Sequence, residues 1–405
     1  MSPRLPQRFA GRRRSLCGIG GRVLALQAVT PAGLVQAAPQ VTLAEARKLI
    51  AQVHRGEPVA ASSSVRRSAA AAVQQIGDVP TLTVVDETAS QLDPFVKYLC
   101  ESAGDRFETV RIPLEHPDRY TVCVSSQVGC ALACAFCATG RLGLTRNLAA
   151  WEIVEQVRVV RARLPQGGNR IGRQGRQERQ GSDEMIQGDL GGLGGQAPGD
   201  PRSSGRPRVH GVVFQGMGEP LANLDAVLAA IAVMTEPCAL GIDARAITVC
   251  TAGLPVGIRR LAREAPNVRL GLSMSSALAA HRKRVMPIAD RHDLDDVLDA
   301  VAEHAMLTRL APMWALTLLA GVNDSDDDAR ALAERAHAFV ARTGKRPRIS
   351  IVAYNAIGGD DPFRRSTRED AFRAVLSAAR LPSHRRYSGG SDVAAACGQL
   401  AATIG

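Results

Sequence analysis

Three cysteines with a short, regular spacing are the residues of this chain best suited to chemistry. Cys130, Cys134 and Cys137 form a C-x3-C-x2-C run, and Phe136 stands directly before the third cysteine. This spacing suits a cubane iron–sulfur cluster held by three protein thiolates. Three ligands on four irons leave one iron open to another molecule. The run therefore predicts a [4Fe–4S] cluster whose open iron takes part in a reaction.

The same run has two other interpretations. A structural zinc site needs a fourth Cys or His ligand. His116 is the nearest upstream candidate, but the chain has no second C-x2-C pair. Isolated buried cysteines would need no common ligand at all. The spacing favours the cluster over both alternatives.

Charge and cysteine content indicate the partner and the compartment. The 405 residues carry a formal net charge of +11, and a basic surplus of this size indicates an acidic partner, with nucleic acid first. Nine cysteines, partly clustered, indicate a metal site in a reducing compartment rather than a disulfide framework. The sequence has no apolar run of transmembrane length. We therefore expect a soluble, cytoplasmic monomer with no membrane partner.

The first forty residues carry little hydrophobic periodicity. An arginine triplet at 12–14 precedes a mildly apolar stretch that ends near Pro39. This arrangement is compatible with a twin-arginine export signal or an organellar presequence. A glycine pair and a proline interrupt the apolar stretch, however. We therefore expect residues 1–40 to form a basic disordered tail.

Hydrophobic periodicity divides the next eighty residues into two parts. Helical spacing of apolar residues predicts a small helical N-terminal domain over 41–80. Short apolar segments predict a β extension over 81–120. The expected helices are 42–54 and 64–76, and the expected strands are 82–85, 95–100 and 107–113.

Alternating strand and helix signals over 121–405 predict parallel strands joined by helical crossovers. Six repeats indicate an α/β fold, a partial (β/α)6 barrel with its site at the C-terminal ends of the strands. The cysteine run follows the first strand and so belongs at that mouth. A Gly-, Gln- and Arg-rich segment, 166–208, is expected to be a flexible insertion. The expected strands are 121–125, 209–214, 246–250, 269–273, 315–319 and 348–353, and the expected helices are 150–163, 224–234, 257–264, 294–305, 326–343 and 367–379.

Three motifs in one order resemble a known family. Residues 123–137, the Gly-Met-Gly-Glu-Pro-Leu segment 216–221 and the Asp-Val-Ala-Ala-Ala-Cys-Gly-Gln-Leu segment 392–400 are similar to motifs of the RlmN/Cfr-type adenine C2 methyltransferases. These are radical S-adenosylmethionine (SAM) enzymes, and the similarity covers residues 42–405 apart from the insertion. The resemblance implies a barrel of the radical SAM type and SAM bound to the open iron. It also implies an RNA substrate, which is ribosomal RNA and in some members tRNA.

The resemblance further implies a two-stage methyl transfer to C2 of an adenosine. The Cys397 thiolate matches the family residue that takes a methyl group from one SAM. A second SAM, cleaved at the cluster, yields a radical that activates this methyl group for addition to C2. Cys123 matches the cysteine that releases the product through a transient disulfide, which a thiol reductant resets. Glu108, in a Glu-Thr-Val motif, matches the base, and Glu115 is the alternative. An external donor such as flavodoxin or ferredoxin supplies the electron.

The resemblance also points to residues at the SAM. Gly218 and Glu219 match the pair that holds the SAM amino group, because glycine admits close backbone approach and a carboxylate pairs with an ammonium. Asn355 matches a family asparagine at the same cofactor.

Two further positions expected at the SAM depart from the family pattern. Cys250 stands where the family usually has serine, and Ser275, two residues after Ser273, replaces a histidine. We expect cofactor binding to survive these changes, which indicate a divergent branch.

Substrate access sets a last requirement. C2 of a stacked adenine is hidden, so the target base should lie in a loop or be flipped into the barrel mouth. The basic run 281–284 is a candidate contact for the RNA backbone, although a solvated helix start explains it equally well.

Two alternative functions remain open at this point. One is a radical SAM enzyme with another product, such as C8 methylation, or with a substrate other than RNA. The other is a zinc-bearing RNA-binding protein without catalysis. The pair of Cys123 and Cys397 favours the methyltransferase over the binding protein, because a binding module needs no methylatable thiol.

Overall fold

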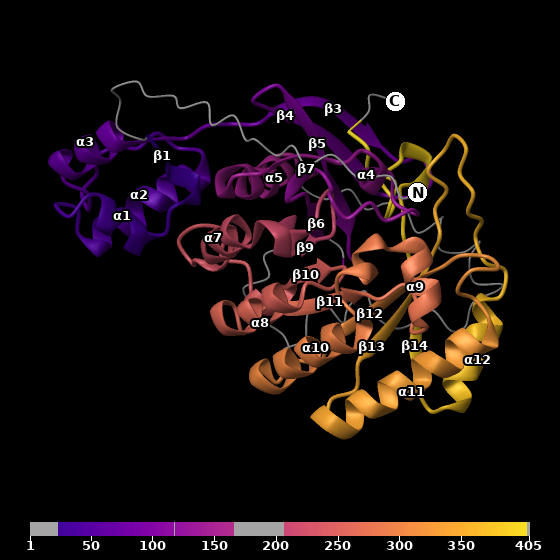
Figure 1. The fold of residues 1–405 in the computed structure, drawn as a ribbon. Helices are drawn as coiled ribbons and strands as arrows, with labels where there is room; N and C mark the ends of the chain where they lie inside the picture. The colour runs from indigo at the N-terminus through magenta and orange to yellow at the C-terminus, as the bar shows by residue number, and fades with distance from the viewer. Residues whose placement is uncertain (1–22, 117, 166–205, 403–405) are drawn as a thin grey trace, which may run out of the picture.

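Ten strands form one sheet that runs through the molecule (Figure 1). The computed structural model describes residues 23–116, 118–165 and 206–402. The strands of this sheet are β3 (Thr83–Ala89), β4 (Val96–Ser102), β5 (Asp105–Pro113), β6 (Arg119–Val124), β9 (Arg208–Phe214), β10 (Ile247–Thr251), β11 (Arg269–Ser273), β12 (Met313–Leu318), β13 (Arg348–Ala353) and β14 (Ser383–Arg386). Their order across the sheet is β14-β13-β12-β11-β10-β9-β6-β5-β4-β3.

The strands from β6 to β14 are parallel and lie in chain order. A helix follows each of the first six: α5 (Ala150–Ala162), α7 (Leu224–Thr235), α8 (Pro255–Glu264), α10 (Leu294–Thr308), α11 (Asp326–Thr343) and α12 (Glu369–Ala378). Consecutive helices of this series contact one another and cover one face of the sheet (Figure 1). Parallel strands in chain order, joined by helices on one face of the sheet, are typical of a (β/α) barrel. In the described sheet β6 and β14 do not pair, so the barrel is partial.

The predicted α/β partial barrel is confirmed, with one strand more than expected. Strands β11 and β13 and helix α11 have the predicted bounds. The unpredicted strand is β14, a four-residue segment of Ser, His and two Arg. Its composition carries no apolar alternation, and its pairing with β13 defines it as a strand.

An antiparallel extension widens the sheet beyond β6, as expected for 81–120. Strands β4 and β5 are joined by Ala103 and Gly104, whose φ angles are 53° and 83°. Two consecutive residues with positive φ form the tight hairpin turn that matches the twist of the strands. This hairpin brings Lys97 and Glu108 onto neighbouring strands.

The N-terminal domain begins earlier than predicted. It comprises β1 (Leu24–Ala25), η1 (Leu26–Ala28), α1 (Pro31–Ala37), α2 (Leu43–Arg55), α3 (Arg67–Ile76) and β2 (Gly77–Asp78). The expectation of a disordered tail over 1–40 is therefore wrong for residues 23–40. Leu26 and Leu34 are buried in the same cluster as α2, and Thr30 caps α1 by accepting a hydrogen bond from the Gly33 amide. Residues 1–22 lie outside the described part of the chain.

The N-terminal domain packs on the barrel through η1, which contacts α5 and α7. The Arg158 guanidinium on α5 donates to the Val53 carbonyl at 2.9 Å. Of the insertion expected over 166–208, residues 166–205 lie outside the described residues, and Arg208 belongs to β9. Among the helices that the structure describes, none combines the length and the apolar character needed to span a membrane.

Candidate active site

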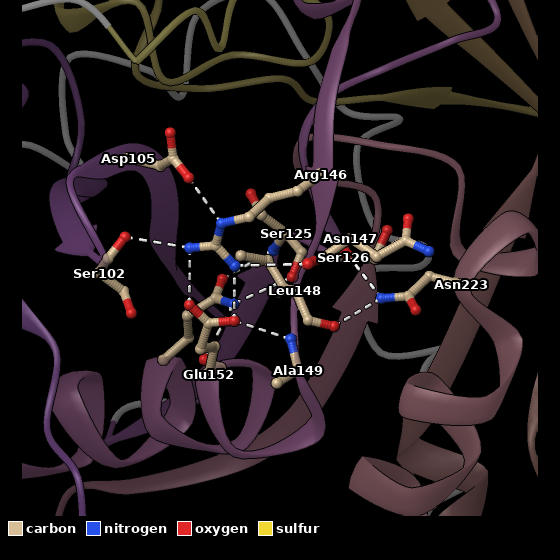
Figure 2. A network of polar contacts seen from close by, with 11 residues as sticks. Ser102, Asp105, Ser125, Ser126, Arg146, Asn147, Leu148, Ala149, Glu152 and Asn223 are labelled. Atoms are coloured by element: carbon tan, nitrogen blue, oxygen red, sulfur yellow. Dashed lines mark hydrogen bonds and ion pairs between the residues drawn. The ribbon is translucent and has the colours of Figure 1, made fainter. Parts of the chain in front are cut away.

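A small hairpin carries the three-cysteine run at the mouth of the barrel. Strands β7 (Gln127–Gly129) and β8 (Leu144–Asn147) enclose the cysteine loop and the short helix α4 (Ala138–Arg141). Figure 2 shows how Arg146 anchors the hairpin. Its guanidinium contacts the Asp105 carboxylate at 2.6 Å, both oxygens of Glu152 at 2.9 Å and the Ser102 carbonyl at 3.0 Å. The β4–β5 turn and α5 thereby fix one end of the cysteine loop.

A second set of contacts joins this hairpin to the Gly216–Pro220 loop. The Asn223 amide donates to the carbonyls of Ser126 and Leu148, both at 2.8 Å (Figure 2). Gln127 accepts a hydrogen bond from the Glu219 backbone N–H at 2.8 Å and donates to Asn147 at 2.8 Å. The two motifs that lie ninety residues apart in sequence are thus held together at the C-terminal ends of β6 and β9.

Cys130, Cys134 and Cys137 line one cavity at this mouth. All three are free thiols. Burial raises the pKa of Cys130 to about 11 and also raises the pKa values of Cys134 and Cys137. In the described residues no three His, Cys, Asp or Glu side chains converge to share a single metal ion. A donor set of three thiols on one cavity fits an iron–sulfur cluster, which distributes its ligands over several irons.

The buried carboxylate of Glu219 faces the same cavity. It accepts hydrogen bonds from the backbone N–H groups of Ala252 at 2.8 Å and Leu221 at 3.0 Å. Burial raises the pKa of Glu219 to about 6, although these donors act in the opposite direction. A buried carboxylate of this kind suits a cationic ligand group.

The structure places most of the expected SAM residues around this cavity. Gly218, Cys250, Ser273 and Ser275 contribute to its lining, together with Glu219. Burial raises the pKa of Cys250 to about 12, and its thiol points to the Gln215 side-chain oxygen at 3.7 Å.

Asn355 lies outside the lining of both described cavities at the barrel mouth. Its amide donates to the Ser388 hydroxyl at 3.1 Å and to the Cys397 carbonyl at 3.2 Å. The structure thus places Asn355 beneath the Cys397 loop, and its role at the SAM stays a prediction.

A second, mostly apolar cavity adjoins the first. Cys123 and Cys397 both line it, and Cys137 and Cys397 line the two cavities in common. Cys123 is buried on β6, and burial raises its pKa, with Cys397 close enough to add to the effect. Both thiols are free in the structure. The remaining lining is Phe95, Val110, Ile112, Leu114, Thr121, Thr139, Val213, Gln215, Gly216, Arg386, Tyr387, Ser388, Gly389, Ala395, Ala396, Gly398 and Leu400.

Backbone contacts hold the Cys397 loop between the cavities. The Cys397 N–H donates to the Ser388 hydroxyl at 2.8 Å. Immediately after it, the Gly398 carbonyl accepts from the Ala138 N–H at 2.7 Å, and the Leu400 carbonyl accepts from the Thr139 hydroxyl at 2.6 Å. Helix α4 therefore ties Cys397 to the cysteine run.

The carboxylate of Glu108 is buried beneath the last described residues of the chain. Its Oε1 lies 3.0 Å from the Lys97 ammonium, and its Oε2 accepts from the N–H groups of Ala401 at 2.9 Å and Ala402 at 3.1 Å. We call residues 399–402 the C-terminal strap. Glu108 lies on the same face of β5 as Val110 and Ile112, which line the second cavity. The C-terminal strap, however, covers the Glu108 carboxylate. Glu115 is exposed beyond the end of β5.

The basic run 281–284 is not a uniform solvated surface. Arg282 on α9 (Ala279–Val285) is buried and donates to the Ala252 carbonyl at 2.7 Å. His281 contacts Asp328 at 2.8 Å. Both explanations weighed for the run, an RNA-backbone contact or a solvated helix start, are therefore wrong for Arg282, because its side chain turns into the protein.

Sequence reasoning missed two charged residues of the site. Lys97 interrupts the apolar segment 95–100, and a lone cation within a buried strand signals a buried partner. Arg386 gave no such signal, since it belongs to a polar segment beside Arg385.

Comparisons with known proteins agree with this geometry. No protein-family model matches the chain. It is 52% identical over 89% of its length, and 88% of the relative, to a probable RNA methyltransferase of Sorangium cellulosum. It is 38% identical over 74% of its length, and 72% of the relative, to the dual-specificity RNA methyltransferase RlmN of Desulfotalea psychrophila.

A solved structure supports the same assignment. The crystal structure of a radical SAM methyltransferase from Sphaerobacter thermophilus superposes with a TM-score of 0.74 and 32% identity, covering 94% of this chain and 100% of that one. Radical SAM methyltransferases of this fold use SAM and a [4Fe–4S] cluster, for which the cavity beside Cys130 has a fitting donor set. The chain belongs to the RlmN-type family of radical SAM RNA methyltransferases.

Proposed function

We propose that this enzyme methylates C2 of an adenosine in ribosomal RNA, and in tRNA where that RNA is also a substrate. Cys397 is the methyl carrier. We call the cavity lined by the three-cysteine run and Glu219 the cofactor cavity, and the mostly apolar cavity lined by Cys123 the apolar cavity. One observation supports this assignment above the others: Cys397 lines both cavities. A group carried on its sulfur is therefore accessible from both sides.

The cofactor cavity supplies the methyl group and the means to activate it. Cys130, Cys134 and Cys137, which line it, would hold the cluster, and Glu219 with the backbone at Gly218 would hold the amino group of SAM. When bound, the cluster and SAM supply a one-electron cleavage that makes a carbon radical able to take a hydrogen atom. Cys397, deprotonated, takes a methyl group from SAM by displacement. After the S-methyl group has lost one hydrogen atom, its carbon forms the new bond to C2.

Cys123 completes the reaction from the apolar cavity. Its thiolate attacks the sulfur of the Cys397–RNA thioether and forms the Cys123–Cys397 disulfide. The methylene carbon keeps the electron pair of the broken carbon–sulfur bond and takes up a proton, which gives the C2 methyl group. An external thiol reduces this disulfide and restores both cysteines. The burial of Cys123 suits a thiol that reacts only with its neighbour.

Glu108 accepts the C2 proton before the product leaves. It is the only one of the two candidate carboxylates that is buried beside the apolar cavity, since Glu115 is exposed. In the described structure its oxygens are occupied by Lys97 and the C-terminal strap. The strap must therefore move when the substrate binds.

The substrate is a base that leaves its stack to enter the apolar cavity. A net charge of +11 favours an RNA backbone at the surface. We also propose that flavodoxin or ferredoxin supplies the electron. Cys250 and Ser275 line the cofactor cavity in place of the usual serine and histidine. They change the polarity of its wall but leave Glu219 and the three-cysteine run in place.

Nucleoside mass spectrometry tests the proposal. The reconstituted enzyme, SAM and a reductant are incubated with ribosomal RNA and tRNA from a strain that lacks the modification. We expect 2-methyladenosine in the ribosomal RNA. An 8-methyl product, or no methylated adenosine despite SAM cleavage, would contradict the proposal.

Cysteine variants test the two thiol roles separately. We expect Cys397→Ala to abolish methylation while the visible absorbance of the cluster remains. Cys123→Ala should trap a covalent protein–RNA adduct that is stable to denaturation. Cys238→Ser, a half-buried thiol outside both cavities, is the matched control and should turn over normally. RNA-free Cys123→Ala protein after turnover would count against the release step.

A further inference from the structure

Arg386 introduces into the apolar cavity a half-buried cation, one of whose donor atoms is buried and unpaired. It is the last residue of β14, opposite Val352 of β13, and it lines the cavity together with Cys123 and Cys397. Its Nη1 atom is buried and has no hydrogen-bond partner within the described residues. Its sequence neighbour Arg385 is different, because that guanidinium pairs with Glu369 at 2.6 Å and Asp370 at 3.0 Å.

The walls of the cavity offer Arg386 no counter-charge. Its described lining contains aliphatic, aromatic, hydroxyl, thiol and amide side chains but no Asp or Glu. Burying a charged donor without a partner is costly, so such a group persists where a ligand completes it. The missing partner is a hydrogen-bond acceptor that enters the cavity from outside.

We propose that Arg386 donates a hydrogen bond to a ring nitrogen next to C2 of the target adenine and thereby selects adenine. This inference rests on the proposed function. C2 lies between N1 and N3, and each carries a lone pair in the plane of the base. If C2 approaches Cys123 and Cys397, one of these nitrogens faces Arg386, the one cationic donor in the described lining of the same cavity. Guanine is rejected, because its N1 carries a hydrogen and its C2 carries an amino group.

The charge of Arg386 also suits the reaction. A guanidinium bonded to N1 or N3 withdraws electron density from C2, where carbon adds. It also stabilises the negative charge that moves onto the ring nitrogen as the C2 proton leaves. Arginine serves better than lysine here, because its planar donors have a fixed direction.

Equilibrium binding with altered bases tests the inference without any methyl transfer. The probe is a short RNA hairpin whose loop carries one adenosine, 1-deazaadenosine, 3-deazaadenosine or guanosine. Anisotropy is measured with the reconstituted full-length enzyme in the absence of SAM. A hydrogen bond to a charged donor predicts that one deaza probe binds about tenfold or more weakly than adenosine. The position of the weaker analogue identifies the nitrogen.

Three variants complete the test. Arg386→Met should bind the adenosine probe about tenfold more weakly and lose the discrimination between adenosine and that deaza probe. Arg386→Lys should retain part of the affinity, and Arg385→Gln, on the adjacent surface position, should behave as wild type. SAM affinity, which depends on the other cavity, reports that each variant is folded.

Two results would overturn the inference. They are equal affinity of the wild type for all four probes, and wild-type discrimination in Arg386→Met. Either result could coincide with 2-methyladenosine in the nucleoside analysis, in which case the proposed function stands and only the role of Arg386 falls.

Discussion

The ammonium of Lys97 lies 3.0 Å from Oε1 of Glu108, and both side chains are buried. The contact is an ion pair whose geometry does not meet that of a directed hydrogen bond. The other carboxylate oxygen accepts two backbone N–H groups from the C-terminal strap. The proposed base is thus held by a neighbouring strand on one side and by the C-terminal strap on the other.

Removing one member of this pair should be costly. Lys97→Met leaves the buried Glu108 carboxylate without its cation, and we expect a loss of about 3–5 kcal/mol in the free energy of unfolding. Urea denaturation measures this loss. The double variant Lys97→Met/Glu108→Gln should recover much of it, because no uncompensated charge remains. Lys283→Met, at an exposed pair with Asp290, is the control and should cost less than about 1 kcal/mol. Equal losses in the two lysine variants would refute a special role for burial.

The C-terminal strap can be tightened at Ala402, whose φ angle is 56°. A left-handed backbone costs an alanine about 1–2 kcal/mol that glycine avoids. Ala402→Gly should therefore stabilise the strap, increase the hydrogen-exchange protection of the amides that bind Glu108, and slow turnover. Ala401→Gly, at a position without positive φ, should reduce that protection. Faster turnover with Ala402→Gly would show that the strap does not restrict Glu108.

Gly218 should tolerate no side chain. Its φ angle is 97°, and an added Cβ would lie 2.5 Å from the Gln127 Cβ. Gly218→Ala should displace the loop that carries Glu219 and weaken SAM binding by about tenfold or more, since a charged contact is lost. Isothermal titration of the reconstituted enzyme measures this effect. Gly321 also has a positive φ angle, 67°, but open space around an added Cβ, so Gly321→Ala should leave SAM affinity unchanged. A parallel loss in both variants would assign the effect to backbone strain alone.

His304 should make the protein sensitive to acid. It is buried on α10, and burial lowers its pKa from 6.5 to about 4. The pKa of His304 is lower in the folded protein than in the unfolded chain. The contribution of this neutral, buried histidine to the free energy of unfolding is therefore fully present above pH 6.5 and is lost as the pH falls toward 4. Between pH 7 and pH 5 this group should remove about 2 kcal/mol. His304→Leu should show a correspondingly smaller loss in urea denaturation across that interval. An identical pH dependence in the two proteins would exclude His304 as the cause.

Local sequence pattern was sufficient to predict the bounds of several strands and helices of the barrel. Strands β11 and β13 have strong apolar character, and α11 begins at the cap Ser325 and ends before Gly344, so periodicity and end signals defined their bounds. The spacing of Cys130, Cys134 and Cys137 likewise predicted a cluster, because all three predicted ligands come from one short segment. The placement of this segment after the first parallel strand followed from the alternation of strands and helices.

The tertiary structure decided everything that depends on distant partners. Arg282 and Arg386 look like surface cations in sequence, yet the first is buried against Ala252 and the second enters an apolar cavity. Asn355 supports the Cys397 loop, and Lys97 finds Glu108 only through the β4–β5 hairpin. Residue type and spacing determine which groups can react, because those properties are local. Which groups meet, and which charges remain unpaired, depends on packing between segments that lie hundreds of residues apart in the chain.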